Sequence, residues 1–345
     1  MYQQFYGLRE LPFELTANPK YLFLTPQHRE ALSTLEYGLF SAKSVTVLIG
    51  EAGTGKTTII GAALESELCR NVSVVHLANP TLTRNEFVEM LSRRFALSPA
   101  TLTSKTALLQ ELERELRDRR ARGQITAIVI DEAQSLSDEL LEEIRLLANI
   151  ETATEKLLPV VLVGQPELRD RLNQTGLRQL KQRVSLRCEI EPFTPQETAG
   201  YISQRVRTAG GDAARLFTRE AVLLIHNRSR GIARVISVMC DNALLTGFAL
   251  NRQPVDSEIV LDVAHDFDLD GMRMRTSDIA PPPPSTADET RAPQLGEAFD
   301  KAPASKESPS EDDAAGTPSG AAGSEPKVLF QDNRVPSRFS LFGRR

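Results

Sequence analysis

The chain has 345 residues, a formal net charge of -5 and a sequence pI of about 5.6. This length allows about two domains of ~100–200 residues each, and the composition, 41% hydrophobic and 25% charged, is that of an ordinary soluble globular protein. The acidic balance argues against bulk, sequence-independent nucleic-acid binding, which usually leaves a basic footprint, but it is compatible with a local basic patch.

The positions of the cysteines and histidines argue against a disulfide-rich or metal-binding protein. The three cysteines are widely spaced and form no C-x-x-C pattern, which favours neither a disulfide framework nor a zinc site; they are Cys69, Cys188 and Cys240. The four histidines lack the spacing of a metal pair, and we expect them to be solvated or to cap helices; they are His28, His76, His226 and His265.

The N-terminal sequence MYQQFYGLRELPF lacks the basic and apolar regions of a signal peptide. No apolar run approaches the ~18–20 residues that a transmembrane helix needs. Together with the cysteine usage, this predicts a protein of the reducing cytoplasm. A peripheral location at the inner membrane would be reached through partners.

From residue 44 to residue 193, apolar runs alternate with helical patterns. Strands are predicted at residues 44–50, 72–78, 125–130, 157–164 and 184–193. Helices are predicted between them at residues 57–68, 84–97, 105–123 and 137–150. This alternation predicts an α/β fold with a parallel sheet and helices on both faces. The continuous Val/Ile/Leu runs are typical of strands buried on both sides.

After residue 193 only helical patterns follow, with cap signals at Thr194 and Asp256. We therefore predict an α/β core at residues 44–193 and a smaller all-helical domain, a C-terminal lid, at residues 194–272. Residues 273–345 are rich in Pro, Ala and Ser and are predicted to be disordered. Their last stretch, VLFQDNRVPSRFSLFGRR, is either a frayed tail or a short anchor for a partner or an acidic surface.

The stretch GEAGTGKTT fits the phosphate-loop pattern G-x-x-x-x-G-K-[ST], and it follows a strand and opens a helix as that motif requires. Backbone N–H groups of such a loop and the helix N-terminus bind phosphate oxygens. Lys56 is expected to reach the β- and γ-phosphates, and the Thr57 hydroxyl to bind Mg²⁺. The nucleotide-binding residues predicted here are Gly50, Glu51, Ala52, Gly53, Thr54, Gly55, Lys56, Thr57 and Thr58. The N-K-x-D element that reads guanine is absent, so we expect ATP.

Two adjacent carboxylates end the third predicted strand. In folds with this loop, a strand beside the phosphate-loop strand ends in an acid that holds Mg²⁺, and Asp131 stands at that place. Glu132 is placed to orient or deprotonate the attacking water. The alternative is that both acids only cap the helix that starts near Ser137. Gln134, which follows them, either packs in the core or relays nucleotide state to the helix at 137–150.

Several stretches in chain order carry a family resemblance. They are FYGLRELPFELTANPKYLFLTPQHREALSTLEYGL, GEAGTGKTT, IVIDEAQSLSDELLEEIRLLANIET, LVGQPELRDRL, LRQLKQRVSLRCEIEPFT and SRGIARVISVMCDNALL. As a set they resemble the AAA+ P-loop ATPases, a three-layer fold with a helical lid. More narrowly they resemble the ExeA/GspA-like secretion ATPases, including the variant associated with exosortase and exopolysaccharide loci. The resemblance covers about residues 2–270.

The resemblance implies further catalytic residues. Gln165 falls at the sensor-1 position and Arg234 at the sensor-2 position, both of which contact the γ-phosphate. Arg183 is the candidate arginine finger, supplied to a neighbouring subunit, and Arg178 is its competitor. For each arginine a plain surface charge is the alternative. Residues 1–43, with the block 21–28, are implied to pack near the adenine.

The resemblance also implies a function: Mg²⁺-dependent ATP hydrolysis by a homo-oligomer, a ring or a nucleotide-dependent assembly. The partners would be proteins of an envelope secretion or polysaccharide-export system. Some secretion members continue into a transmembrane helix and a peptidoglycan-binding domain, whereas a polar tail follows here. We therefore do not expect the peptidoglycan role to apply.

Two other functions remain open. The basic stretch RELRDRRARG at residues 114–123 suits a DNA-binding AAA+ adaptor of the transposition-helper type. Interleaved glutamates make an ordinary charged helix surface the competing interpretation, so nucleic acid is not favoured as a partner. The last option, a nucleotide-gated scaffold with negligible turnover, is ranked lowest because both acids and both candidate arginines are present.

Overall fold

The computed structural model describes residues 1–16, 18–77 and 81–267. Its centre is a five-stranded sheet in the order β2-β3-β4-β1-β5, in which every strand pair is parallel. The strands are β1 (Val45–Gly50), β2 (Val72–Leu77), β3 (Ile125–Ile130), β4 (Val160–Gly164) and β5 (Val184–Ile190). Each lies within or at a predicted strand, so the α/β prediction is confirmed.

The order of the strands corrects one expectation. We expected the strand that ends in Asp131 to lie beside the phosphate-loop strand, but β4 lies between β3 and β1. Ile49 of β1 pairs with Gly164 of β4, and Ile130 of β3 pairs with Leu162. The residue after β4, Gln165, therefore lies between the phosphate loop and the two acids. Sequence spacing does not reveal which strands pair, because pairing is set by long-range contacts.

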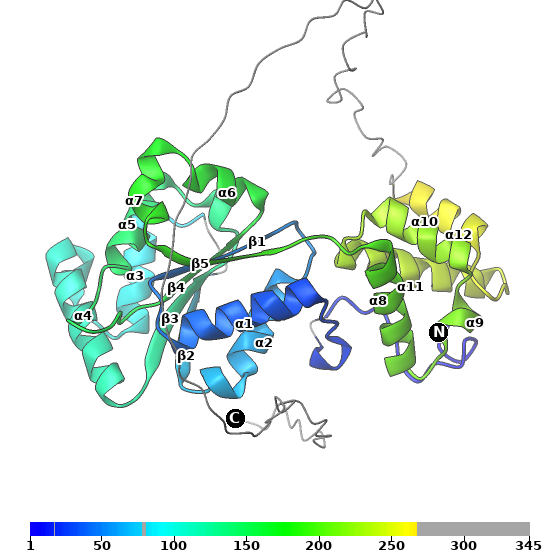
Figure 1. Cartoon of the computed structure of the whole chain (residues 1–345), viewed down its shortest axis with the longest axis horizontal. Helices are drawn as coiled ribbons and strands as arrows, with labels where there is room; N and C mark the ends of the chain where they lie inside the picture. Colours follow the sequence, from blue (N-terminus) through cyan, green and yellow to red (C-terminus); the bar gives the residue numbers. More distant parts are fainter. Residues whose placement is uncertain (17, 78–80, 268–345) are drawn as a thin grey trace, which may run out of the picture. The chain divides into compact units, whose positions relative to one another are not determined.

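Both faces of the sheet are buried, and side chains alternate between them with period two. Val47, Ile128 and Leu162 belong to one core cluster, and helices α3 to α6 supply its other side. Leu48, Val129 and Val163 belong to a second cluster, which α1 and α2 cover (Figure 1). Burial on both faces explains why these strands are continuous apolar runs rather than alternating ones.

Helices of the α/β part connect the strands. The α-helices are α1 (Pro26–Phe40), α2 (Lys56–Glu65), α3 (Arg84–Arg94), α4 (Lys105–Ala121), α5 (Asp138–Leu147), α6 (Pro166–Leu172) and α7 (Arg178–Lys181). Short 3-10 helices are η1 (Pro19–Tyr21), η2 (Glu67–Cys69), η3 (Pro99–Leu102), η4 (Ala133–Ser135) and η5 (Thr175–Leu177). Between β4 and β5 the sequence pattern predicted no helix. Both helices there, α6 and α7, are too short for a clear helical period.

The described chain after β5 consists of five α-helices joined by short loops, and we call α8–α12 the helical region. Its members are α8 (Pro195–Thr208), α9 (Ala213–Leu216), α10 (Arg219–Ser229), α11 (Ala233–Ala249) and α12 (Ser257–Asp266). The predicted cap signals are confirmed: Thr194 and Glu197 form a capping box on α8, and Asp256 accepts the N–H of Ile259 on α12. Predictions for residues 273–345, including disorder and the aromatic-basic end, lie outside the described residues.

The N-terminal segment packs on the helical region. Tyr2, Tyr6, Leu8 and Phe13 share one core cluster with α8–α12, and the Tyr2 hydroxyl donates to Asp241 of α11. The apolar side chains of residues 1–13 therefore form part of the core of the helical region, whereas α1 packs on the sheet. None of the helices within the described residues combines the length and the apolar character needed to cross a membrane.

Arg205 of α8 joins this segment to the helical region. Its side chain is 8% exposed, and it donates to the carbonyls of Pro12 (2.5 Å) and Glu14 (2.9 Å). It also donates to the Tyr201 hydroxyl at 2.8 Å, and its guanidinium lies 4.8 Å from the centre of the Tyr21 ring. One planar cation with several fixed donors thus satisfies the buried carbonyl of Pro12 and the partly buried carbonyl of Glu14 at the same time.

The change Arg205→Lys is therefore expected to destabilise the protein. A lysine cannot reproduce the planar fork, so the buried carbonyl of Pro12 or the partly buried one of Glu14 loses its partner. We expect the free energy of unfolding to fall by about 2 kcal/mol. Urea unfolding followed by circular dichroism measures this change. Arg207→Lys, at an exposed position of the same helix, is the control and should change it by less than about 0.5 kcal/mol. Equal stability of both variants would contradict the role given to Arg205.

Candidate functional site

The loop between β1 and α2 has a shape that requires glycine. Gly53 and Gly55 have φ angles of 83° and 101°, in the left-handed region that disfavours other residues. A Cβ on Gly50 would lie 2.8 Å from the carbonyl oxygen of Ile190. The glycines of the motif thus allow the chain to curl tightly between the end of the strand and the first turn of the helix.

Lys56 is the first residue of α2 and its side chain lies against the loop. Its Nζ donates to the carbonyl oxygens of Gly50 (2.8 Å) and Glu51 (3.0 Å), and only 6% of the residue is exposed. Burial lowers the pKa of Lys56, while the negative charges of Glu132 and Asp131 oppose this shift. The ammonium group is therefore held where a phosphate bound in the loop would meet it.

Thr57 and Asp131 bring two oxygen ligands together from different elements. The Thr57 hydroxyl, in the first turn of α2, donates to a carboxylate oxygen of Asp131 at 3.3 Å. The other carboxylate oxygen accepts the backbone N–H of Glu132 at 2.9 Å. This donor set fits Mg²⁺, which is commonly held by one or two protein oxygens together with water and substrate phosphates.

Glu132 is held by two side-chain amides. Its backbone has a φ angle of 51°, a left-handed conformation that is uncommon for a residue other than glycine. One of its carboxylate oxygens accepts from Gln134 (2.5 Å) and from Gln165 (3.1 Å). These hydrogen bonds, first that of Gln134, lower the pKa of Glu132 together with the charge of Lys56. Glu132 is therefore an ionised carboxylate at neutral pH.

Gln134 connects the acids to the end of β4. Its amide oxygen accepts the backbone N–H of Gln165 at 3.1 Å, and its backbone oxygen accepts from Arg171 of α6 at 2.7 Å. A Cβ on Gly164 would lie 2.8 Å from this amide oxygen, so only glycine leaves room for it. The choice between packing and relay that the sequence left open is thus replaced by a hydrogen-bonding role on Glu132.

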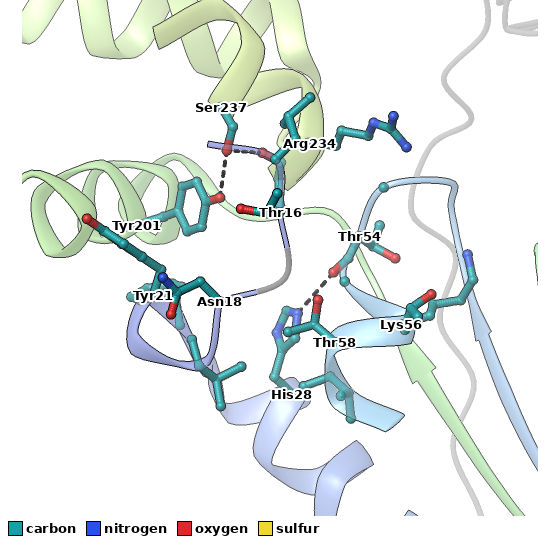
Figure 2. Close-up of a pocket in the computed structure, with 18 of the residues that line it drawn as sticks. Thr16, Asn18, Tyr21, His28, Thr54, Lys56, Thr58, Tyr201, Arg234 and Ser237 are labelled. Carbon is teal, nitrogen blue, oxygen red and sulfur yellow. Dashed lines mark hydrogen bonds between the residues drawn. The ribbon is translucent and has the colours of Figure 1, made fainter. Parts of the chain in front are cut away.

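Arg234 brings the helical region to the phosphate loop. Its backbone N–H, in the first turn of α11, donates to the carbonyl of Gly53 at 3.1 Å. The Cβ of Arg234 is so close that a Cβ on Gly53 would lie 2.8 Å from it. Figure 2 shows this residue in the same pocket as Lys56 and Thr54. The structure thus places Arg234 beside the loop.

Arg178 and Arg183 lie elsewhere. Arg178 begins α7 and is exposed, and Arg183 precedes β5. Neither is among the described residues that line the pocket. The structure therefore does not bring them to the phosphate loop of their own chain.

One pocket of about 430 Å³ joins the phosphate loop, the two acids and Arg234, whereas Gln134 and Gln165 are not among the described residues that line it. Residues 52–58 and the acids Asp131 and Glu132 line its phosphate end, while Gly50 and Glu51 contribute only the carbonyls that bind Lys56. The other end is lined by rings and small polar groups from residues 21–28, from the segment between β5 and α8, from α8 and from α11. They are Tyr21, Phe23, His28, Phe193, Tyr201 and Ser237.

The sequence did not indicate three of the six residues named at the aromatic end of the pocket. The block 21–28 was expected near the adenine, but Phe193, Tyr201 and Ser237 were not singled out. The Tyr201 hydroxyl lies 2.7 Å from the Ser237 hydroxyl, and the centre of its ring is 5.3 Å from the centre of the Phe193 ring. Phe193 and Ser237 stand within stretches that carry the family resemblance, but nothing in the local pattern of these three residues indicates a binding role. The packing of β5–α8 and α11 around residues 21–28 brings them into the pocket.

Comparisons with known proteins identify a family for the chain. A family model described as AAA domain matches residues 40–172. General secretion pathway protein A of Aeromonas hydrophila is 40% identical over 250 residues, which cover 72% of this chain and 45% of that protein. The chain thus spans less than half the length of this relative.

Solved structures support the fold alone, because their sequences are distant. Cdc6p of Pyrobaculum aerophilum aligns with a TM-score of 0.55 at 18% identity, covering 72% of this chain and 70% of that one. The ORC2 protein of Aeropyrum pernix aligns with a TM-score of 0.52 at 16% identity, covering 74% and 71%. With the phosphate loop, the strand acids and the helical region in place, the chain belongs to the AAA+ P-loop ATPases of the ExeA/GspA-like family.

Proposed function

We propose that the protein binds ATP with Mg²⁺ in this pocket and hydrolyses it. The observation that supports the proposal most is the convergence of Lys56, Thr57, Asp131 and Glu132 at one edge of the sheet, within a network of hydrogen bonds and electrostatic contacts. Phosphates would bind in the loop, and the base would lie against the aromatic end of the pocket.

Each polar residue has a role that its environment supports. Lys56 and the loop N–H groups bind the β- and γ-phosphates and stabilise charge on the transferring group. Bound Mg²⁺, held by Thr57 and Asp131, would neutralise charge on the phosphates. Glu132, ionised because its amide partners lower its pKa, accepts a proton from the attacking water. Gln165 holds Glu132 and would contact the γ-phosphate.

Lys56→Ala and Glu132→Gln separate binding from hydrolysis. The first removes the phosphate cation and should abolish nucleotide binding. The second keeps the shape but removes the base, so kcat should fall by at least ~100-fold while binding persists. Phosphate release and fluorescent-nucleotide binding measure these effects. Glu139→Gln, at an exposed carboxylate of α5, is the control. Undiminished turnover in both variants would overturn the enzymatic proposal, and binding without turnover in the wild type would indicate a nucleotide-gated scaffold.

Gln134→Leu tests whether the hydrogen bond from the Gln134 amide lowers the pKa of Glu132. Without this hydrogen bond the pKa of Glu132 rises toward its ordinary value, so the acidic limb of the pH–kcat profile should move to higher pH. We expect kcat to fall by about tenfold with little change in KM, because one hydrogen bond to the base is lost. The exposed Gln124→Leu serves as control. An unchanged pH profile would show that Gln134 does not tune Glu132.

We propose further that hydrolysis takes place between subunits, with Arg183 as the finger and Arg178 as the alternative. Neither arginine lines the pocket of its own chain, which suits action on a neighbour. A trans-acting arginine makes hydrolysis depend on assembly. Turnover per subunit should then rise with protein concentration.

Mixing inactive variants identifies the finger. Arg183→Ala subunits keep an intact site but offer no finger, whereas Glu132→Gln subunits offer a finger but cannot hydrolyse. Each alone should be inactive, and the mixture should regain turnover. The same mixture with Arg178→Ala tests the competitor, and the exposed Arg187→Ala is the control. If both single arginine variants keep wild-type turnover, neither residue is a finger.

The cellular pathway is proposed from the similarity to General secretion pathway protein A. Identity of 40% to a general secretion pathway protein over 250 residues supports a role in powering or regulating an envelope secretion or polysaccharide-export system. In the encoding organism, a Lys56→Ala chromosomal variant should lose export of the cargo that depends on this protein. Normal export and normal surface polysaccharide would contradict this assignment.

The DNA-binding alternative receives little support from the described surface. Three arginines of the basic stretch on α4 form ion pairs: Arg117 with Glu113, Arg119 with Glu115, and Arg120 with Glu155. Arg119 also lies 4.9 Å from the centre of the Phe95 ring. Charges paired in this way offer less positive potential to a phosphate backbone.

A further inference from the structure

His28 differs from the solvated or helix-capping histidine that the sequence led us to expect. It lies in the first turn of α1, is only 3% exposed and lines the nucleotide pocket. Its Nδ1 is 2.7 Å from the Thr25 hydroxyl, and its Nε2 is 3.2 Å from the backbone oxygen of Thr54 in the phosphate loop. Both ring nitrogens are therefore engaged, one of them on the loop.

The partners determine which nitrogen carries the proton. A carbonyl oxygen can only accept, so Nε2 is protonated and donates to Thr54. Nδ1 of the neutral ring then accepts from the Thr25 hydroxyl, whose oxygen also accepts the backbone N–H of His28 at 3.3 Å. Burial lowers the pKa of His28, which agrees with a neutral ring.

This contact fixes the orientation of one peptide group in the loop. In a planar trans peptide the C=O and the following N–H point in opposite directions. Because the Thr54 carbonyl points to His28, the N–H of Gly55 points the other way. Figure 2 shows Lys56 extending on the side of the loop away from His28, where its Nζ meets the carbonyls of Gly50 and Glu51. The N–H of Gly55 is thus directed to the side on which phosphate would bind.

The same ring contacts the other end of the pocket. It lies 5.5 Å from the ring of Phe193, which in turn lies 5.6 Å from Phe23 and 5.3 Å from Tyr201. His28 therefore stands between the aromatic wall and the phosphate loop and touches both.

We propose that His28 is a positioning residue that holds the Thr54–Gly55 peptide in its phosphate-binding orientation through the Nε2 hydrogen bond, and that its ring packing on Phe193 is secondary. This inference rests on the proposed function, because it assigns a role within the same ATP site. It predicts that loss of the Nε2–H donor weakens binding of a polyphosphate even when the ligand carries no adenine.

Two substitutions separate the hydrogen bond from the packing. His28→Gln keeps an N–H donor near the position of Nε2 without the ring, and His28→Phe keeps a ring against Phe193 without the donor. Isothermal titration with Mg²⁺–ATP and with Mg²⁺–tripolyphosphate measures both affinities. We expect His28→Phe to bind each about tenfold more weakly and His28→Gln to stay within about threefold of the wild type.

A second threonine–histidine pair supplies the control. Thr198 of α8 lies 2.9 Å from Nδ1 of His226 on α10, and this histidine does not line the pocket. His226→Phe and His226→Gln should leave both affinities unchanged. Thermal unfolding checks that each variant is folded, and His28→Asn, whose amide is too short to reach Thr54, replaces His28→Phe if that variant does not fold.

The two affinities distinguish a role of the hydrogen bond from a role of ring packing or of contact with the adenine. Weak binding by His28→Gln with normal binding by His28→Phe would show that packing, not the hydrogen bond, matters, and would overturn the proposal. A loss of ATP affinity with unchanged tripolyphosphate affinity would show that His28 acts on the adenine, and this result would also overturn the proposal. Wild-type protein that binds neither ligand would overturn the proposed function and this inference with it.

Discussion

The parallel direction of β1, β4 and β3 is the constraint on which the site depends. Parallel neighbours end at the same edge of a sheet, so the phosphate loop, Gln165 and the pair Asp131–Glu132 meet there although long stretches of sequence separate them. β4 in the middle is essential to this geometry. It places Gln165 where its amide reaches Glu132, and its last residue, Gly164, leaves room for Gln134.

The sheet edge supplies only one wall of the pocket, and the helical region supplies the other. The contact between Gly53 and Arg234 joins the two walls through backbone atoms. Gly231, just before α11, is as tightly placed, since a Cβ there would lie 2.1 Å from the carbonyl oxygen of Phe193. Arg205 and Tyr2 fasten the N-terminal segment to the same helices. Residues far apart in the sequence, from Glu14 to Ser237, thus line a single pocket.

The sequence predicted those features that depend on local pattern. Continuous apolar runs identified the strands, and the glycine-rich loop identified Lys56 and Thr57 because phosphate binding needs those residue types at fixed spacing. The strand order was predicted wrongly, since pairing is decided by long-range packing. The roles of Gln134 and His28 were missed for a related reason. Gln134 is oriented toward Glu132 while it accepts the N–H of Gln165 after β4, and His28 contacts Thr54 of the phosphate loop. Such long-range contacts leave no spacing in the sequence that would reveal them.

The central claim is that one pocket, formed by the phosphate loop, the strand acids, residues 21–28 and α11, binds Mg²⁺–ATP. A crystal structure with a non-hydrolysable ATP analogue and Mg²⁺ tests it most directly. The account predicts phosphates enclosed by residues 50–58, the metal at Thr57 and Asp131, and the base against Tyr21 and Phe193. A nucleotide bound elsewhere, or a base pointing away from the aromatic wall, would contradict it.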